Sequence, residues 1–190
     1  MALTKTKKII LISALEGLAA IALAALLVFS LWILCSPQTM ATASEKAGNY
    51  SFAVTCADLK YKYSKNTSDL ARCVQDSILS GKDKDIIKYG DKFIGDSKFE
   101  EVCATRGEKY GVTFADYVIG NVAAAKYRKE GLQEAVNTCK KGTGKSFIWL
   151  TLEVKDGGNA EDIKGLSAEL ENLTQDETIK NLLQILDTGE

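Results

Sequence analysis

The chain has 190 residues, a formal net charge of −1, a single proline and no histidine. Without histidine it has no Ser-His-Asp or Cys-His catalytic arrangement, no His-liganded zinc and no histidine pH switch. Its 24 Lys and Arg residues form no dense basic stripe along the sequence, so we expect no nucleic-acid partner.

A long apolar segment from Ile9 to Cys35 dominates the N-terminal part of the chain, and its only charged side chain is Glu16. An apolar run longer than about 18 residues is typical of a transmembrane helix. It also exceeds the apolar region of a signal peptide, about 7–15 residues. We therefore predict a retained membrane anchor. The alternative is a signal peptide cleaved after the small residues Ala41 and Ala43.

Three lysines, Lys5, Lys7 and Lys8, precede the apolar segment. By the positive-inside rule, residues 1–8 form a cytoplasmic basic N-terminus and residues 36–190 lie outside the cytoplasm. We therefore expect a single-pass protein of the cell membrane.

The sequence allows two positions for Glu16 relative to the membrane. The residues after it, Gly17 to Cys35, already span about 28 Å as a helix, which places Glu16 at the cytoplasmic interface. Alternatively, Glu16 lies in the membrane and contacts a partner helix. A face of small residues favours helix contact and completes the candidate set: Ser13, Glu16, Gly17, Ala20 and Ala24.

Residues 36–190 carry helix-period apolar patterns separated by Gly, Asn and Ser turns. Ser36-Pro37 is a helix start, Ser68 and Thr113 are expected caps, and residues 106–112 are expected to form a loop. The predicted helices cover residues 37–47, 50–63, 69–80, 85–94, 98–105, 114–129, 132–141, 146–155, 160–172 and 175–186.

Two features of the C-terminal part leave alternatives open. Residues 146–155 are predicted as a helix, although their alternation would also fit a strand. Residues 150–190 hold 10 acidic against 3 basic residues, whereas residues 36–149 hold 14 against 18. We interpret this asymmetry as two differently charged solvated surfaces, or as an acidic end that folds against the basic half or meets a basic partner.

The predicted fold class is all-α: an N-terminal transmembrane helix followed by antiparallel helical hairpins. Short helices joined by short turns pack either as an α-solenoid or as a compact helical bundle.

The turn Gly48-Asn49-Tyr50, followed by Ala53, resembles the central turn of a tetratricopeptide (TPR) repeat. Gly81 repeats it more loosely 33 residues later, and Gly131 with Ala135 gives a third copy after 50 residues. The resemblance implies TPR-like repeats over residues 36–141 that bind a peptide or protein segment on a concave face. The acidic helices of residues 142–190 would then pack on the repeats or cap them.

Cysteine spacing excludes zinc ribbons and thioredoxin-like chemistry, because no two cysteines form a CxxC pair. Cys56, Cys73 and Cys103 lie on apolar helix faces. They are either buried small side chains or partners in a disulfide, with Cys56–Cys73 and Cys73–Cys103 as the candidate pairs. Gly142 to Ser146 matches only the tail of a phosphate-binding loop, so we expect an inter-helix turn there.

These features predict a membrane-anchored, extracytoplasmic scaffold that binds an unidentified protein or peptide. The alternative is a small subunit of a membrane-protein complex that associates through its transmembrane helix. We expect no enzymatic activity, no catalytic residues, no metal and no cofactor.

Overall fold

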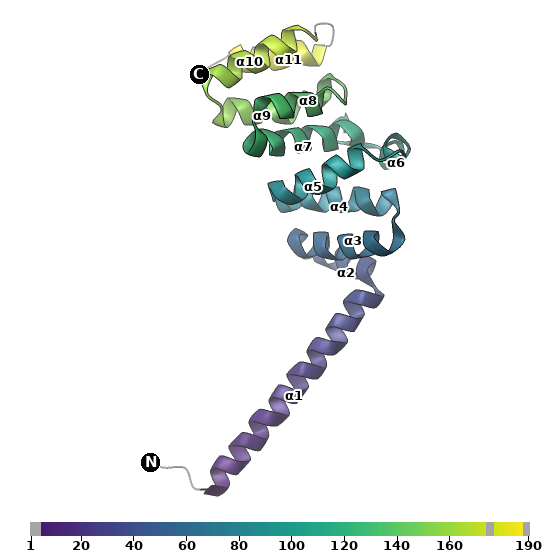
Figure 1. Cartoon of the computed structure of the whole chain (residues 1–190), viewed down its shortest axis with the longest axis vertical. Coiled ribbons are helices and arrows are strands. Elements are labelled where there is room, and N and C mark those ends of the chain that lie inside the picture. The colour runs from purple at the N-terminus through teal and green to yellow at the C-terminus, as the bar shows by residue number, and fades with distance from the viewer. Residues whose placement is uncertain (1–4, 174–176, 188–190) are drawn as a thin grey trace.

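The computed structural model describes residues 5–173 and 177–187. This part of the chain has 11 α-helices: α2 to α11 stack into an elongated array, and α1 projects away from one end of it as a rod (Figure 1). The helices are α1 Lys5–Cys35, α2 Pro37–Lys46, α3 Tyr50–Ser64, α4 Thr67–Ser80, α5 Asp83–Ile94, α6 Phe99–Arg106, α7 Phe114–Glu130, α8 Leu132–Cys139, α9 Phe147–Gly157, α10 Ala160–Glu171 and α11 Glu177–Asp187.

Consecutive helices pack against each other as pairs, as the all-α prediction expects. α2 pairs with α3, α4 with α5, α7 with α8 and α10 with α11. The long interval between Gly81 and Gly131 has a structural cause: α6 and a short β ribbon are inserted between the second and third pairs.

Helix α1 is exposed along its apolar length. Ala14–Ile33 is long and apolar enough to cross a membrane, and none of it is buried in the protein. Such a helix fits a signal anchor or a signal sequence. Only Ser36 separates α1 from α2.

The first helix pair docks onto the end of α1. Phe29 of α1 stacks on Phe52 of α3 with ring centroids 6.4 Å apart. Ile33 packs on a small cluster formed by Met40, Ala41 and Cys56. The rod is therefore joined to the stack by side-chain packing as well as by the chain itself.

Two larger apolar cores meet at α7. One runs from α3 to α7 and contains Phe93 and Val118; the other runs from α7 to α11 and contains Leu150 and Leu166. Most of α7 is buried on both sides, because neighbouring residues such as Val122 and Ala123 face different cores. α7 is thus the central helix of the stack.

Glycines allow the helices next to α7 to approach it closely. A Cβ atom on Gly90 of α5 would overlap Val122 of α7. A Cβ atom on Gly120 of α7 would lie 2.5 Å from Trp149 Cε3 and 2.7 Å from the Ser146 carbonyl oxygen. These contacts require the absence of a side chain at both positions.

The acidic C-terminal helices fold in part against the basic half. Lys140 of α8 pairs with Glu169 of α10 at 2.7 Å, and Arg128 of α7 pairs with Glu153 of α9. The Tyr127 hydroxyl donates a hydrogen bond of 2.8 Å to Asp162.

Two local predictions are wrong. Residues 106–112 are not only a loop, because β1 Glu108–Lys109 pairs antiparallel with β2 Val112–Thr113. The cap of α4 is Asn66 rather than Ser68: the Asn66 side chain accepts the Ser68 backbone N–H at 2.8 Å, and the helix begins two residues earlier than expected.

Other local predictions are confirmed. Thr113 caps α7, and residues 147–157 are helical, preceded by a 3-10 turn at Gly144–Ser146. Pro37 opens α2, although the Ser36 side chain makes no capping hydrogen bond. The expected start of the last helix falls on residues 174–176, which lie outside the described residues.

Candidate functional site

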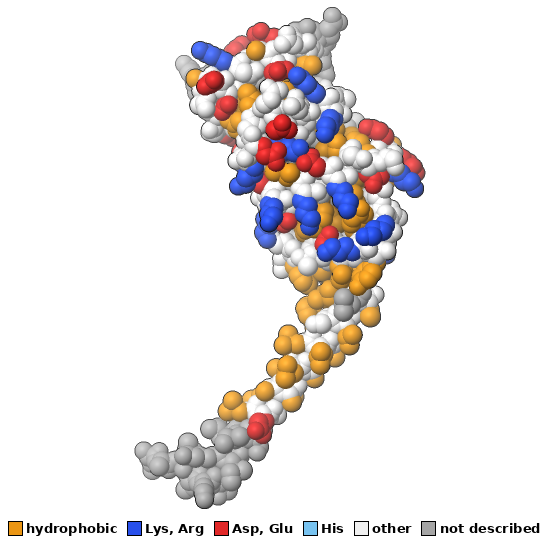
Figure 2. Space-filling view, viewed as in Figure 1, with side chains coloured by type: hydrophobic (Ala, Val, Ile, Leu, Met, Phe, Trp, Pro, Cys, Tyr) orange, Lys and Arg blue, Asp and Glu red, His pale blue; other side chains and the backbone are white. Residues whose placement is uncertain are grey.

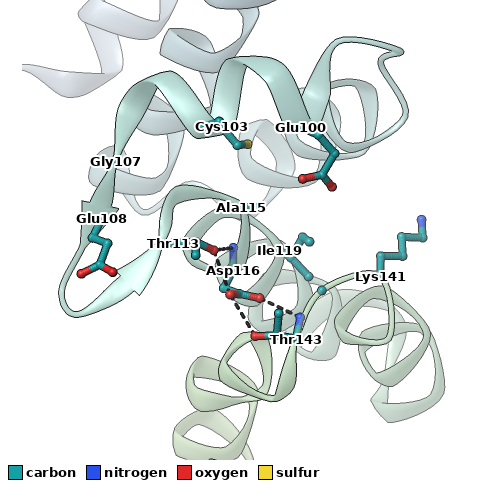
Figure 3. Close-up of a pocket in the computed structure, with 12 residues that line it drawn as sticks. Glu100, Cys103, Gly107, Glu108, Thr113, Ala115, Asp116, Ile119, Lys141 and Thr143 are labelled. Atoms are coloured by element: carbon teal, nitrogen blue, oxygen red, sulfur yellow. Dashed lines mark hydrogen bonds between the residues drawn. The ribbon is translucent and has the colours of Figure 1, made fainter.

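A recess with a volume of about 580 Å³ lies between α6, the β ribbon and the start of α7 (Figure 3). The loop between α8 and α9 closes its fourth side. Ala115 and Ile119 of α7 and Cys103 of α6 contribute the apolar part of the wall. This volume lies within the range of ligand-binding pockets, about 300–1,000 Å³.

Asp116 fixes the floor of the recess. It is 2% exposed, and its Oδ2 accepts hydrogen bonds from the hydroxyls of Thr113 (2.8 Å) and Thr143 (2.9 Å). Its Oδ1 accepts the backbone N–H of Thr143 at 2.8 Å. One carboxylate thus binds Thr113, the cap residue of α7, and ties the α8–α9 loop to it.

This arrangement also explains the partial phosphate-loop pattern at Gly142–Ser146. The segment is a turn between α8 and α9, as expected. Its Thr143 amide, which in a phosphate loop would face the ligand, is already bonded to Asp116.

The rim of the recess is mainly acidic. Glu100 and Glu108 lie on α6 and β1, whereas Lys141 lies on the opposite edge (Figure 3). Burial raises the pKa of the Cys103 thiol to about 12, so it stays protonated and is a poor nucleophile. The recess is therefore suited to binding an apolar or basic side chain rather than to thiol chemistry.

A second unusual cluster joins α2, α4 and α6. Asp76 is fully buried and neither carboxylate oxygen has a hydrogen-bond partner. Arg72 lies 3.9 Å from Asp76, but it bonds Glu45 of α2 at 2.7 Å. Burial, and then the nearby Glu45 carboxylate, raise the pKa of Asp76 to about 7, although Arg72 and Arg106 oppose the shift. The Arg72–Glu45 pair thus couples the first helix pair to the second, directly beside the buried Asp76 carboxyl.

The predicted repeat-turn residues lie at separate helix ends along the stack. Gly48, Gly81 and Gly131 all have positive φ (71°, 68° and 94°), which ends one helix and reverses the chain. Asn49 caps α3 by accepting the Phe52 N–H at 3.2 Å, next to Tyr50, the first residue of α3. The small residues Ala53 and Ala135 are completely buried at the helix pairs. These residues shape the turns and do not form one site.

The candidate membrane contacts Glu16, Gly17, Ala20 and Ala24 are exposed on α1. The side chain of Ser13 lies outside the described residues. No other described helix covers this segment, so it is free to contact lipid or a partner helix.

The three candidate disulfide cysteines are free thiols. Cys56 lies in the small cluster between α2 and α3, while Cys73 and Cys103 lie in the core that runs from α3 to α7. Burial raises the pKa of all three, that of Cys73 to about 12. In the structure they behave as buried small apolar side chains.

Sequence reasoning missed the recess and the exposed tip of the β ribbon. Tyr110 at this tip is 76% exposed and has a positive φ of 52°, followed by Gly111 at 78°. Two positive φ angles in a two-residue loop define a type I′ hairpin turn. Gly107 and Gly111 flank the short segment of residues 108–110, and this spacing of two glycines is the sequence signal that could have predicted the hairpin.

Comparisons with known proteins give no relative. No protein-family model matches the chain, and neither the curated proteins nor the solved structures contain a significant match.

Proposed function

We propose that the chain is a membrane-anchored scaffold that binds a protein segment outside the cytoplasm through a TPR-like array of helix pairs. The observation that carries the proposal is the stack of consecutive helix pairs joined without a linker to an exposed apolar helix (Figure 1). A stack of this kind exposes a long side surface relative to its core, which is the property that helical scaffolds use for binding.

Two further observations support this function. The docking of Phe52 on Phe29 holds the first helix pair against the end of α1, so an α1 that spans the membrane would present the stack close to its surface. The recess beside α6 and α7 offers an apolar wall with an acidic rim, which suits a side chain of a bound segment. In this proposal the basic residues 1–8 keep the N-terminus in the cytoplasm.

The second candidate function is assembly into a membrane complex through α1. Glu16 favours it, because a carboxylate on an otherwise apolar exposed helix is a costly residue to retain without a contact. In this case the stack would be an appendage and the small-residue face of α1 would carry the interaction.

Site-specific photo-crosslinking in intact cells separates the two functions. A benzophenone amino acid is placed in the full-length chain at Glu108, on the recess rim, or at Ala20, on α1. Scaffold function predicts protein crosslinks from the Glu108 position, whereas the assembly function predicts them only from the Ala20 position. Crosslinks confined to α1 would refute the scaffold.

A further inference from the structure

A band of exposed lysines crosses the side of the stack formed by α3, α5 and the end of α7. We call it the lysine band: Lys62, Lys65, Lys84, Lys88, Lys92 and Lys129, all of them exposed. Figure 2 shows Lys and Arg side chains gathered on this face at the level of α3 to α5. The band is not recognisable in the sequence, because its residues come from three helices that are not consecutive in the chain.

Aromatic rings beneath the band orient the ammonium groups without neutralising them. The ring of Tyr61 lies 4.6 Å from Lys92 Nζ and 5.9 Å from Lys65 Nζ, which joins α3 to α5. Lys88 Nζ lies 4.3 Å from the centre of the Tyr89 ring and donates to its hydroxyl at 2.9 Å. These cation–π contacts hold the charges at the surface and leave them available.

Two of the six lysines of the band pair with carboxylates. Lys62 pairs with Asp58 at 2.7 Å and Lys129 approaches Asp83 at 3.7 Å. Within residues 5–173 and 177–187, the other four lysines have no carboxylate within ion-pair distance. The unpaired lysines repel one another, and binding of an anionic partner relieves this repulsion.

The band also contains an apolar hollow. Lys84, Lys88 and Lys129 surround a recess of about 540 Å³ whose apolar wall is Ile87, and Glu130 closes one edge. Ile87 packs, partly buried, against the core that runs from α3 to α7, so the hollow has an apolar wall inside a cationic rim. This combination fits an apolar side chain that is flanked by acidic residues.

We propose that the lysine band binds an acidic segment of a partner protein, with one apolar side chain of that segment in the hollow beside Ile87. The inference rests on the proposed scaffold function and names the chemistry of the partner. A protein segment is favoured over a lipid surface because the hollow beside Ile87 lies among the lysines and can take one apolar side chain.

The test uses the full-length chain in nanodiscs of phosphatidylcholine and an array of synthetic peptides. Each peptide places one apolar residue among acidic, neutral or basic neighbours. We expect the acidic peptides to be selected, and the double variant Lys84→Glu, Lys88→Glu to bind them at least about tenfold more weakly. The matched control, Lys98→Glu with Lys164→Glu, makes the same charge change at two exposed lysines outside the band and should bind like the wild type.

Three outcomes would overturn the inference: no selection of acidic peptides, equal loss in both double variants, or band-dependent binding only to vesicles that contain phosphatidylserine. Photo-crosslinking in cells separates this failure from failure of the scaffold. Partner crosslinks from Glu108 but not from Lys92 would refute the lysine band and keep the scaffold. Crosslinks from neither position would refute both.

Discussion

Gly120 should tolerate no side chain, because it is where α9 approaches the central helix α7. In the variant Gly120→Ala the new Cβ would lie 2.5 Å from Trp149 Cε3 and 2.7 Å from the Ser146 carbonyl oxygen. The indole can turn, but the carbonyl belongs to the backbone at the start of α9. Relief of the overlap therefore requires α7 and α9 to move apart.

Two opposing effects determine how much Gly120→Ala changes the free energy of unfolding. Alanine in place of glycine inside a helix stabilises by about 1 kcal/mol. Over-packing of a close-packed interior costs about 1–3 kcal/mol, and the contact with a backbone atom puts Gly120 in the upper part of that range. The net loss should be about 1–2 kcal/mol. For a protein of this size it corresponds to a fall in Tm of roughly 3–6 °C.

Thermal unfolding of the full-length chain in detergent, followed by tryptophan fluorescence, measures the effect. Gly157→Ala is the matched control, since Gly157 is also helical and a Cβ atom added there would have no heavy atom within 4 Å. It should raise the Tm slightly. If both variants raise the Tm equally, α7 and α9 do not pack closely at Gly120 and the reasoning fails.

Three further predictions concern buried polar groups. Asp116→Ala removes the acceptor of the Thr143 amide and should cost about 2–4 kcal/mol in urea unfolding; an unchanged midpoint would refute its role in tying the loop to α7. Thr151 is fully buried with an unpartnered hydroxyl, so Thr151→Val should stabilise by about 1 kcal/mol, whereas Thr138→Val loses a hydrogen bond to Glu134 and should not; equal Tm shifts would contradict this. Burial raises the pKa of Asp76 from 3.8 to about 7, so the folded state binds a proton more tightly than the unfolded chain, and stability should fall as pH rises from 3.8 to about 7. Asp76→Asn should flatten this part of the pH–stability curve, and a slope identical to that of the wild type would show that another group causes it.

Local features were predictable because the interactions that cause them span only a few residues. Thr113 and Asn159 cap their helices through backbone amides two or three positions away. The positive φ of Gly48 and Gly131 follows from the need to reverse the chain between two helices. Asn66 and Ser68 show the limit of this reasoning: both are good caps, and only the backbone conformation selects Asn66.

The sequence by itself determined the helical class, the exposed apolar helix and most helix ends, since periodicity and capping are local properties. The tertiary structure decided what each helix face meets. It placed α7 between two cores, and it brought Asp116 to Thr143 across 27 residues. It also gathered lysines from three helices into one band around Tyr61 and Ile87. These contacts join residues distant along the chain, and their geometry depends on how every intervening helix packs.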